Sequence, residues 1–199
     1  SWNLRGLSVT APHKQEVKEY LDWIEPTARE IGAVNTVVVE ADRLLGYNTD
    51  APGFIDPLLQ KFESLAGRRA AIIGAGGAAR AVIWALRRQN ANVTIFARNV
   101  SKAESFGVNC QQLASATFRG YDLVVNTTPL GSGTYIDESP VTAEQLNGVR
   151  CAYDLIYNPA DTRFLGEARE AGCDTIGGLE MLVAQAKIQF ELWTGRKPG

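Results

Sequence analysis

The sequence of 199 residues has little histidine, cysteine and methionine, and it has no long uninterrupted apolar run. Its one histidine, His13, cannot supply a multi-histidine metal site, so we expect no metal in its chemistry. Its three cysteines are Cys110, Cys151 and Cys173. An odd number of widely spaced cysteines argues against a disulfide framework and for a reducing compartment, and we expect all three to be small buried apolar residues.

Charge of one sign is not concentrated in any segment. Twenty lysines and arginines oppose 22 aspartates and glutamates, so the formal net charge is −2. This near balance argues against nucleic acid or a membrane surface as partner. Arg80 and Arg87 interrupt the most apolar region, which falls short of the ~18 to 20 residues of a membrane span. Because the first residues also lack a signal-peptide pattern, we expect a cytoplasmic protein.

Methionine occurs once, at Met181, so we do not expect Ser1 to be an unprocessed translation start. The first 65 residues also contain few predicted elements for a complete domain. We therefore expect one or more βα units to precede Ser1 in a longer polypeptide.

Strands and helices alternate after a change of composition near residues 65–69. An apolar strand is predicted at 70–73, followed by a glycine turn and an amphipathic helix. Further strands are predicted at 93–97, 122–126, 151–156 and 174–177, and further helices at 161–171 and 178–193. Strands connected by helices form a parallel sheet covered on both faces, so the expected fold class is α/β with a Rossmann-like C-terminal part.

The part before residue 65 shows a different pattern. A helix opened by Pro12 is predicted, with Val17, Leu21 and Ile24 on one face. Residues 34–40 and 44–48 are predicted to form an antiparallel pair of strands.

The glycine turn is typical of a dinucleotide-binding fold. Gly74, Gly76 and Ala79 fill the G-x-G-x-x-G/A positions between a buried strand and a helix. The first glycine permits a tight turn, the second allows backbone amides to approach a pyrophosphate, and the small third residue lets helix pack on strand. The alternative is a tight turn that binds no ligand.

The end of the next predicted strand selects between the two nicotinamide cofactors. An acidic residue there would accept the ribose 2′-hydroxyl, whereas a basic residue accommodates a 2′-phosphate. This segment contains Arg98 and, one turn later, Lys102, and it has no carboxylate, which favours NADP. The alternative for both side chains is a solvated surface charge.

Three polar residues in the first part of the chain are candidates for chemistry. Lys14 falls in the first turn of the predicted helix, where the positive end of the dipole disfavours an ammonium group, although a solvated lysine is the alternative. Asn35 and Asp50 lie on short polar interruptions of apolar segments. Asp50 could instead be the N-cap of a helix that ends near Phe62.

Six motifs, taken in order, resemble the shikimate dehydrogenase family. The pattern V-T-x-P-x-K, A-V-N-T, G-x-N-T-D-x-x-G, G-x-G-G-x-x-x-A, N-T-T-P-x-G and G-G-x-x-M-L-x-x-Q is matched by residues 9–14, 33–36, 46–53, 74–81, 126–131 and 177–185. The resemblance covers essentially the whole chain. It implies reversible hydride transfer between NADP(H) and the ring carbon that is a ketone in 3-dehydroshikimate and an alcohol in shikimate.

The resemblance also implies roles for individual residues. Lys14 and Asp50 match the catalytic pair. Residues matched to the substrate site are Ser8, Thr10, Asn35, Tyr157 and Gln185. Residues matched to the cofactor site are Gly74, Ala75, Gly76, Gly77, Ala78, Arg98, Lys102, Thr127, Thr128, Pro129, Gly178 and Met181. The implied organisation is a substrate domain at 1–65, incomplete at its N-terminus, an NADP-binding domain at 66–176, and a helical segment at 177–199 that returns to the substrate domain.

The sequence departs from the family pattern in three places. Ser8 stands where many members have asparagine, and Ala97 to Asn99 replace N-R-T while keeping the arginine. The family's S-x-S motif, which holds the substrate carboxylate, would lie before Ser1, so we expect the chain from Ser1 to bind shikimate poorly. A fusion to another shikimate-pathway domain upstream is compatible with this start.

Two other functions fit the same motifs. One is a quinate/shikimate dehydrogenase that uses NAD, against which Arg98 argues. The other is a non-catalytic module that senses a metabolite, against which the presence of both Lys14 and Asp50 argues.

Overall fold

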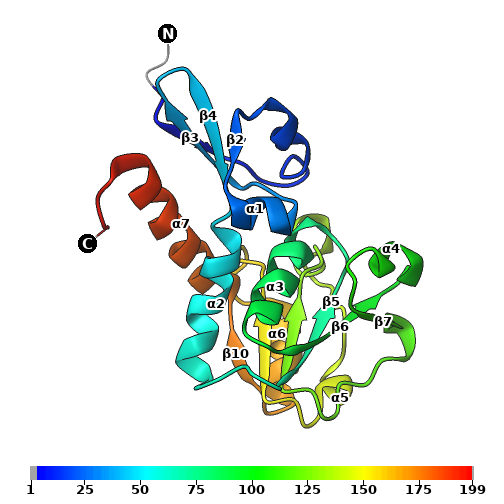
Figure 1. The fold of residues 1–199 in the computed structure, drawn as a ribbon. Helices are drawn as coiled ribbons and strands as arrows, with labels where there is room; N and C mark the ends of the chain where they lie inside the picture. Colours follow the sequence, from blue (N-terminus) through cyan, green and yellow to red (C-terminus); the bar gives the residue numbers. More distant parts are fainter. Residues whose placement is uncertain (1–3, 199) are drawn as a thin grey trace.

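The computed structural model describes residues 4–198, without the side chain of Lys102, and contains two sheets (Figure 1). The smaller sheet has the strand order β1-β3-β4-β2, in which β3 is antiparallel to β1 and β4, and β2 is parallel to β4. Its strands are β1 (Gly6–Ser8), β2 (Trp23–Ile24), β3 (Thr36–Glu40) and β4 (Arg43–Tyr47). The predicted antiparallel pair is therefore confirmed.

The larger sheet is parallel throughout, as predicted, with the order β10-β9-β8-β5-β6-β7. Its strands are β5 (Arg69–Ile73), β6 (Asn92–Ala97), β7 (Asn109–Gln112), β8 (Leu123–Asn126), β9 (Cys151–Asp154) and β10 (Asp174–Ile176). Sequence analysis did not predict β7, because its residues are polar and it forms the edge of the sheet.

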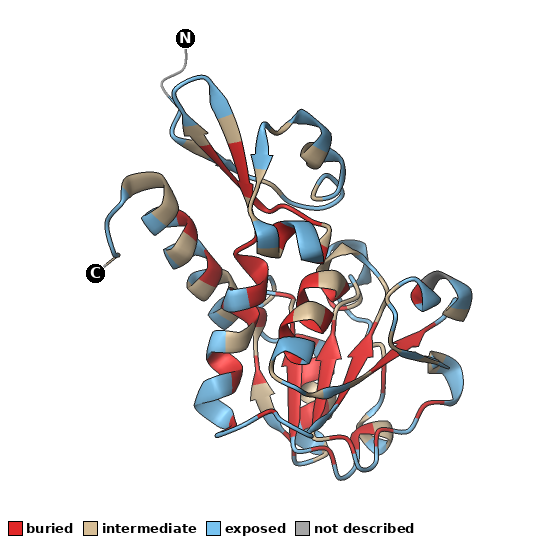
Figure 2. Ribbon diagram, viewed as in Figure 1, coloured by how far each residue is buried: buried red, intermediate tan, exposed pale blue. Residues whose placement is uncertain are grey.

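Helices cover both faces of the parallel sheet. The helices of the structure are α1 (Pro26–Ile31), α2 (Asp50–Lys61), α3 (Gly77–Arg88), α4 (Val100–Glu104), α5 (Ala143–Leu146), α6 (Arg163–Glu170) and α7 (Gly178–Thr194), with 3₁₀ turns η1 (Glu16–Tyr20), η2 (Leu113–Ser115) and η3 (Gly133–Tyr135). Alternate strand residues point to opposite faces, so Ile72 joins the core formed with α2 and α3, while Ile73 joins the core formed with α6. Figure 2 shows the central strands between these layers as buried.

Helix α7 connects the two sheets. It runs beside α2, and its later residues reach β3 (Figure 1). Trp193 Nε1 donates a hydrogen bond of 2.9 Å to the Val37 carbonyl, and a Cβ atom on Gly53 of α2 would lie 2.7 Å from the Cβ of Gln185. The absence of a side chain at Gly53 therefore allows α2 and α7 to pack closely.

The predicted helix starting at Pro12 is wrong. Residues 11–15 form turns and η1 is a short 3₁₀ helix. The Lys14 carbonyl accepts a hydrogen bond of 2.8 Å from the Val34 amide, so it is occupied by a distant part of the chain. The apolar face was identified correctly, because Val17, Leu21 and Ile24 pack against a small core that includes Val34.

Two of the three cysteines, Cys151 and Cys173, are buried as expected, whereas Cys110 is half-buried on the edge strand β7. Within residues 4–198, no helix has the length and apolar character needed to cross a membrane.

Replacing Tyr153 with phenylalanine is expected to stabilise the protein. The Tyr153 ring is fully buried and stacks on Phe54 with a centroid distance of 4.9 Å, but its hydroxyl has no hydrogen-bond partner in the described part of the chain. Removing an unpaired buried hydroxyl should raise the free energy of unfolding by about 1 kcal/mol. Urea denaturation measures this, with Tyr20→Phe as an exposed control, and a loss of stability in Tyr153→Phe would contradict it.

Candidate active site

The connections of the parallel sheet reverse direction between β5 and β8. At such a reversal the loops after two neighbouring strands lead to opposite faces of the sheet, and ligands bind in the crevice at the carboxyl ends of these strands. The loop after β5 contains Gly74, whose φ of +105° favours glycine. A Cβ atom there would also lie 2.9 Å from Thr127 Oγ1 on the loop after β8. The two loops therefore meet with no room for a side chain at Gly74.

A cavity of about 510 Å³ opens at this point. It is lined by Gly74, Ala75, Gly76, Phe96, Ala97, Arg98, Asn99, Leu113, Thr127, Thr128, Pro129, Leu130, Tyr135 and Glu138. Seven of the residues that the resemblance assigned to the cofactor are in this set. Leu113, Tyr135 and Glu138 were not predicted, because they lie far from the glycine turn in the sequence.

The start of α3 suits a bound anion. Cβ atoms built on Gly76 and Gly77 meet nothing within 4 Å, so the backbone is open to a ligand there. The first amides of a helix are unpaired donors at the positive end of its dipole. Ala79 is fully buried against the sheet, as its small size predicted. These features fit the pyrophosphate of a dinucleotide.

Arg98 follows β6 at the rim of this cavity, and its side chain is exposed. Its backbone carbonyl accepts a hydrogen bond of 3.4 Å from Gln112 Nε2, but within the described residues its guanidinium group forms no hydrogen bond or ion pair with the protein, so it is free to bind an external anion. The side chain of Lys102, which was predicted to act with it, lies outside the described residues.

A second cavity of about 300 Å³ brings together residues that are far apart in the sequence. It is lined by Ser8, Val9, Thr10, Lys14, Asn35, Asp50, Ala78, Leu155, Tyr157, Gly178, Met181, Leu182 and Gln185. All seven residues predicted for catalysis and substrate binding are present. Ala78, next to the glycine turn, also lines this cavity, so the beginning of α3 lies between the two cavities.

Lys14 and Asp50 form an ion pair inside the second cavity. Lys14 Nζ lies 2.8 Å from Asp50 Oδ2, and the two side chains are 19% and 10% exposed. Asp50 Oδ1 accepts a second hydrogen bond, of 2.9 Å, from Asn35 Nδ2. The N-cap alternative for Asp50 is wrong, because Thr49 holds that position and Asp50 is the first residue of α2.

A buried network of amides and hydroxyls supports this pair. Asn35 Nδ2 also donates to Thr49 Oγ1 at 2.9 Å and to Gln185 Oε1 at 3.3 Å. Gln189 Nε2 donates to Thr36 Oγ1 at 2.9 Å and to Ser8 Oγ at 3.3 Å. Gln189, Thr36 and Thr49 were not predicted. For Gln189 the available signal was its position one turn after Gln185, on the same face of the helix.

Three family models match the chain. The shikimate dehydrogenase substrate binding domain matches residues 1–37, shikimate / quinate 5-dehydrogenase matches residues 57–128, and the shikimate 5'-dehydrogenase C-terminal domain matches residues 178–199. A shikimate dehydrogenase (NADP(+)) from Carboxydothermus hydrogenoformans is 41% identical, over 100% of this chain and 75% of that protein. The chain belongs to the shikimate dehydrogenase family.

Solved structures of shikimate dehydrogenases have the same fold. The enzyme from Thermus thermophilus, crystallised with NADP(H) and shikimate, is 41% identical with a TM-score of 0.90, over 100% of this chain and 76% of that one. A shikimate dehydrogenase crystallised with NADP+ is 39% identical with a TM-score of 0.92, over 98% of this chain and 73% of that one. The chain therefore spans about three quarters of the length of these relatives.

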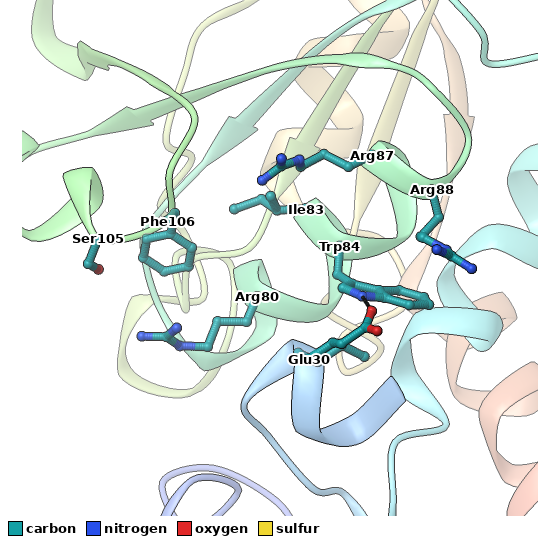
Figure 3. A pocket seen from close by; sticks show the side chains of 9 residues that line it. Glu30, Arg80, Ile83, Trp84, Arg87, Arg88, Ser105 and Phe106 are labelled. Atoms are coloured by element: carbon teal, nitrogen blue, oxygen red, sulfur yellow. Dashed lines mark hydrogen bonds between the residues drawn. The ribbon is translucent and has the colours of Figure 1, made fainter. Parts of the chain in front are cut away.

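A third cavity, of about 450 Å³, lies between α1 and α3 and contains none of the residues predicted from the shikimate dehydrogenase motifs (Figure 3). Trp84 Nε1 donates a hydrogen bond of 3.0 Å to Glu30, and the Arg88 guanidinium lies 5.5 Å from the Trp84 ring centroid. The Arg80 guanidinium lies 4.8 Å from the centroid of Phe106. Of these contacts, the Trp84–Glu30 hydrogen bond joins α1, in the first part of the chain, to α3.

One further carboxylate, Asp154, is fully buried at the end of β9. Burial raises the pKa of Asp154 to about 6, although hydrogen bonds from Thr162, Ile156 and Asn126 lower it in part. The proton therefore binds more tightly in the folded protein than in the unfolded chain, whose ordinary aspartate pKa is about 3.9.

We expect the stability of this protein to depend on the titration of Asp154. Because its pKa is raised on folding, its contribution to stability is fully present below about pH 4 and is lost as the pH rises through about 6, by up to about 3 kcal/mol. Asp154→Asn should remove this part of the pH dependence. Urea denaturation between pH 4 and pH 7 measures it, with the exposed Asp42→Asn as control. A constant difference in stability between Asp154→Asn and the parent protein would contradict the expectation.

Proposed function

We propose that this protein is a shikimate dehydrogenase that catalyses the reversible NADPH-dependent reduction of 3-dehydroshikimate to shikimate in aromatic amino acid biosynthesis. The observation that carries the proposal is the Lys14–Asp50 pair, at 2.8 Å, in a cavity of hydroxyl and amide groups next to the glycine turn. Relatives at about 40% identity carry the same activity in their names, with NADP as cofactor.

The chain's own groups supply a proton donor and its support. NADPH, when bound, supplies the hydride that adds to the ketone carbon, and the carbonyl electrons then form an alkoxide. Lys14 Nζ donates its proton, or a hydrogen bond, to that oxygen. Asp50 Oδ2 holds the ammonium group in place, while Asn35 fixes Asp50 through its other oxygen. In the reverse direction Lys14 Nζ receives the proton of the shikimate hydroxyl.

The remaining lining residues suit a ring that carries several hydroxyl groups. We assign Ser8, Thr10, Asn35, Tyr157 and Gln185 to the substrate, since each side chain offers a hydroxyl or an amide to the cavity. Gln185 Oε1 is already held by Asn35 and Thr49, so its position is set before substrate binds.

The cofactor site follows the first cavity. We assign the pyrophosphate to residues 74–78 and the start of α3, and the 2′-phosphate to Arg98 and Lys102. Thr127, Thr128 and Pro129 form the opposite wall. Gly178 and Met181, which line the second cavity, would lie beside the nicotinamide. The corresponding domain division is 1–65 for substrate, 66–176 for NADP, and 177–199 for the segment whose helix α7 (Gly178–Thr194) joins them.

The two alternative functions have less support. The model that matches residues 57–128 covers quinate as well as shikimate, but the free guanidinium of Arg98 favours NADP over NAD. The half-buried Lys14, held by a carboxylate inside the second cavity, argues against a non-catalytic sensor.

Lys14→Ala is expected to lower kcat by about 10²- to 10⁴-fold with a smaller effect on KM for shikimate, because the proton donor acts in the transition state. Asp50→Asn should behave similarly. Steady-state kinetics of the complete protein measure both, with Lys18→Ala as the control. If Lys14→Ala raised KM and left kcat intact, Lys14 would be a binding residue only.

Arg98→Ala is expected to weaken NADP binding by about 10- to 100-fold, because each charge-assisted hydrogen bond contributes about 1.5–3 kcal/mol. NAD has no 2′-phosphate, so its affinity should change little. Calorimetric titration with each cofactor tests this, with the exposed Arg119→Ala as control. An equal loss of affinity for NADP and NAD would show that Arg98 is a solvated surface charge and would reopen the NAD alternative.

A further inference from the structure

The buried carboxylate of Asp154 lies between two loops that belong to different cavities. Its Oδ1 accepts hydrogen bonds from Asn126 Nδ2 at 3.1 Å and from the Ile156 amide at 3.0 Å. Its Oδ2 accepts a bond of 2.6 Å from Thr162 Oγ1. Asp154 lines neither the first nor the second cavity. Any effect of Asp154 on these cavities must therefore pass through the residues that it bonds.

On one side, Asp154 fixes the loop of the cofactor cavity through Asn126. Asn126 Oδ1 accepts bonds from the Thr128 amide at 3.0 Å and from Thr128 Oγ1 at 2.7 Å. Asn126 Nδ2 also donates to the Leu130 carbonyl at 3.2 Å. The asparagine therefore determines the path of residues 127–130, and Asp154 orients the asparagine.

On the other side, Asp154 fixes the start of α7 through Ile156. The Ile156 carbonyl accepts a bond of 3.1 Å from the Gly178 amide, the first residue of α7. A Cβ atom on Gly178 would lie 2.4 Å from that carbonyl oxygen, so the loop and the helix are in close contact. Helix α7 then carries Met181 and Gln185 into the second cavity.

We propose that Asp154 is a positioning residue. It holds the loop at residues 127–130 and the start of α7 at a fixed separation, and so fixes the position of the nicotinamide relative to the substrate. The β8–β9 ladder also joins the two loops, through the Leu155 amide and the Asn126 carbonyl at 3.2 Å, but this bond does not orient the Asn126 side chain. This inference rests on the proposed function for its kinetic part and on geometry alone for its structural part.

The structural part is tested without turnover, by amide hydrogen exchange in the ligand-free complete protein. In Asp154→Ala the Ile156 amide loses its acceptor, whereas the acceptors of the Thr128 and Gly178 amides lose their orientation. All three amides should therefore exchange at least about tenfold faster. Asp122→Asn is the matched control, since Asp122 bonds Arg68 and the Arg69 amide at the opposite end of the strands. Exchange at Gly178 equal to that in Asp122→Asn would overturn the proposal.

The kinetic part separates positioning from binding. A displacement of about 1 Å between reacting groups can cost about 100-fold in rate, so Asp154→Ala should lower kcat by up to this factor, with KM for both ligands within about threefold. The isotope effect with NADPH deuterated at the transferred position should rise towards its intrinsic value. Asp154→Asn, which keeps an acceptor oxygen for Asn126 and Ile156, should recover most of kcat. A raised KM with unchanged kcat would overturn the proposal.

A second pair of variants decides the question if Asp154→Ala does not fold. Thr162→Val removes the hydroxyl that donates to Oδ2, and Thr162→Ser keeps it. A raised isotope effect in Thr162→Val but not in Thr162→Ser supports the proposal, and equal effects overturn it. If the unsubstituted complete protein reduced no 3-dehydroshikimate, the proposed function would fail, while the exchange measurement would still test the structural link.

Discussion

The relative position of the residues in the second cavity depends on the hydrogen bonds of the Asn35 side chain. It is 2% exposed, and its single amide group joins the carboxylate of Asp50, the hydroxyl of Thr49 and the amide oxygen of Gln185. Its own oxygen accepts the Thr49 amide at 2.8 Å. The residue before β3, the start of α2 and the middle of α7 therefore meet at one side chain. A buried amide with unpaired groups is costly, so these segments are held together by the requirement to satisfy it.

The same requirement explains why Lys14 can be largely buried. An ammonium group removed from water needs a close anion and further hydrogen bonds around that anion. Asp50 supplies the anion at 2.8 Å, and Asn35 supports Asp50. The pair thus has a defined geometry before any ligand arrives. A general acid held in this way needs little rearrangement during the reaction.

Sequence alone predicted the parallel sheet, because its strands are short apolar runs bounded by turn residues, and the glycine turn marked β5 and α3. The predictions failed where a distant contact replaced a local preference. The helix expected from Pro12 does not form, and the Lys14 carbonyl bonds Val34. The N-cap alternative for Asp50 failed because α2 begins one residue earlier than expected, with Thr49 at the N-cap. Gln189 was missed because its partners, Ser8 and Thr36, are more than 150 residues away.

The close crossing of α2 and α7 at Gly53 has a consequence for the chemistry. Asp50 lies three residues before Gly53 on α2, and Gln185 is the residue that Gly53 meets on α7. Any side chain at this position would push the helix axes apart and would move the carboxylate away from the amide in the same step. The closest approach of the two helices therefore sets the distance between the Asp50 carboxylate and the Gln185 amide, two of the groups that line the second cavity.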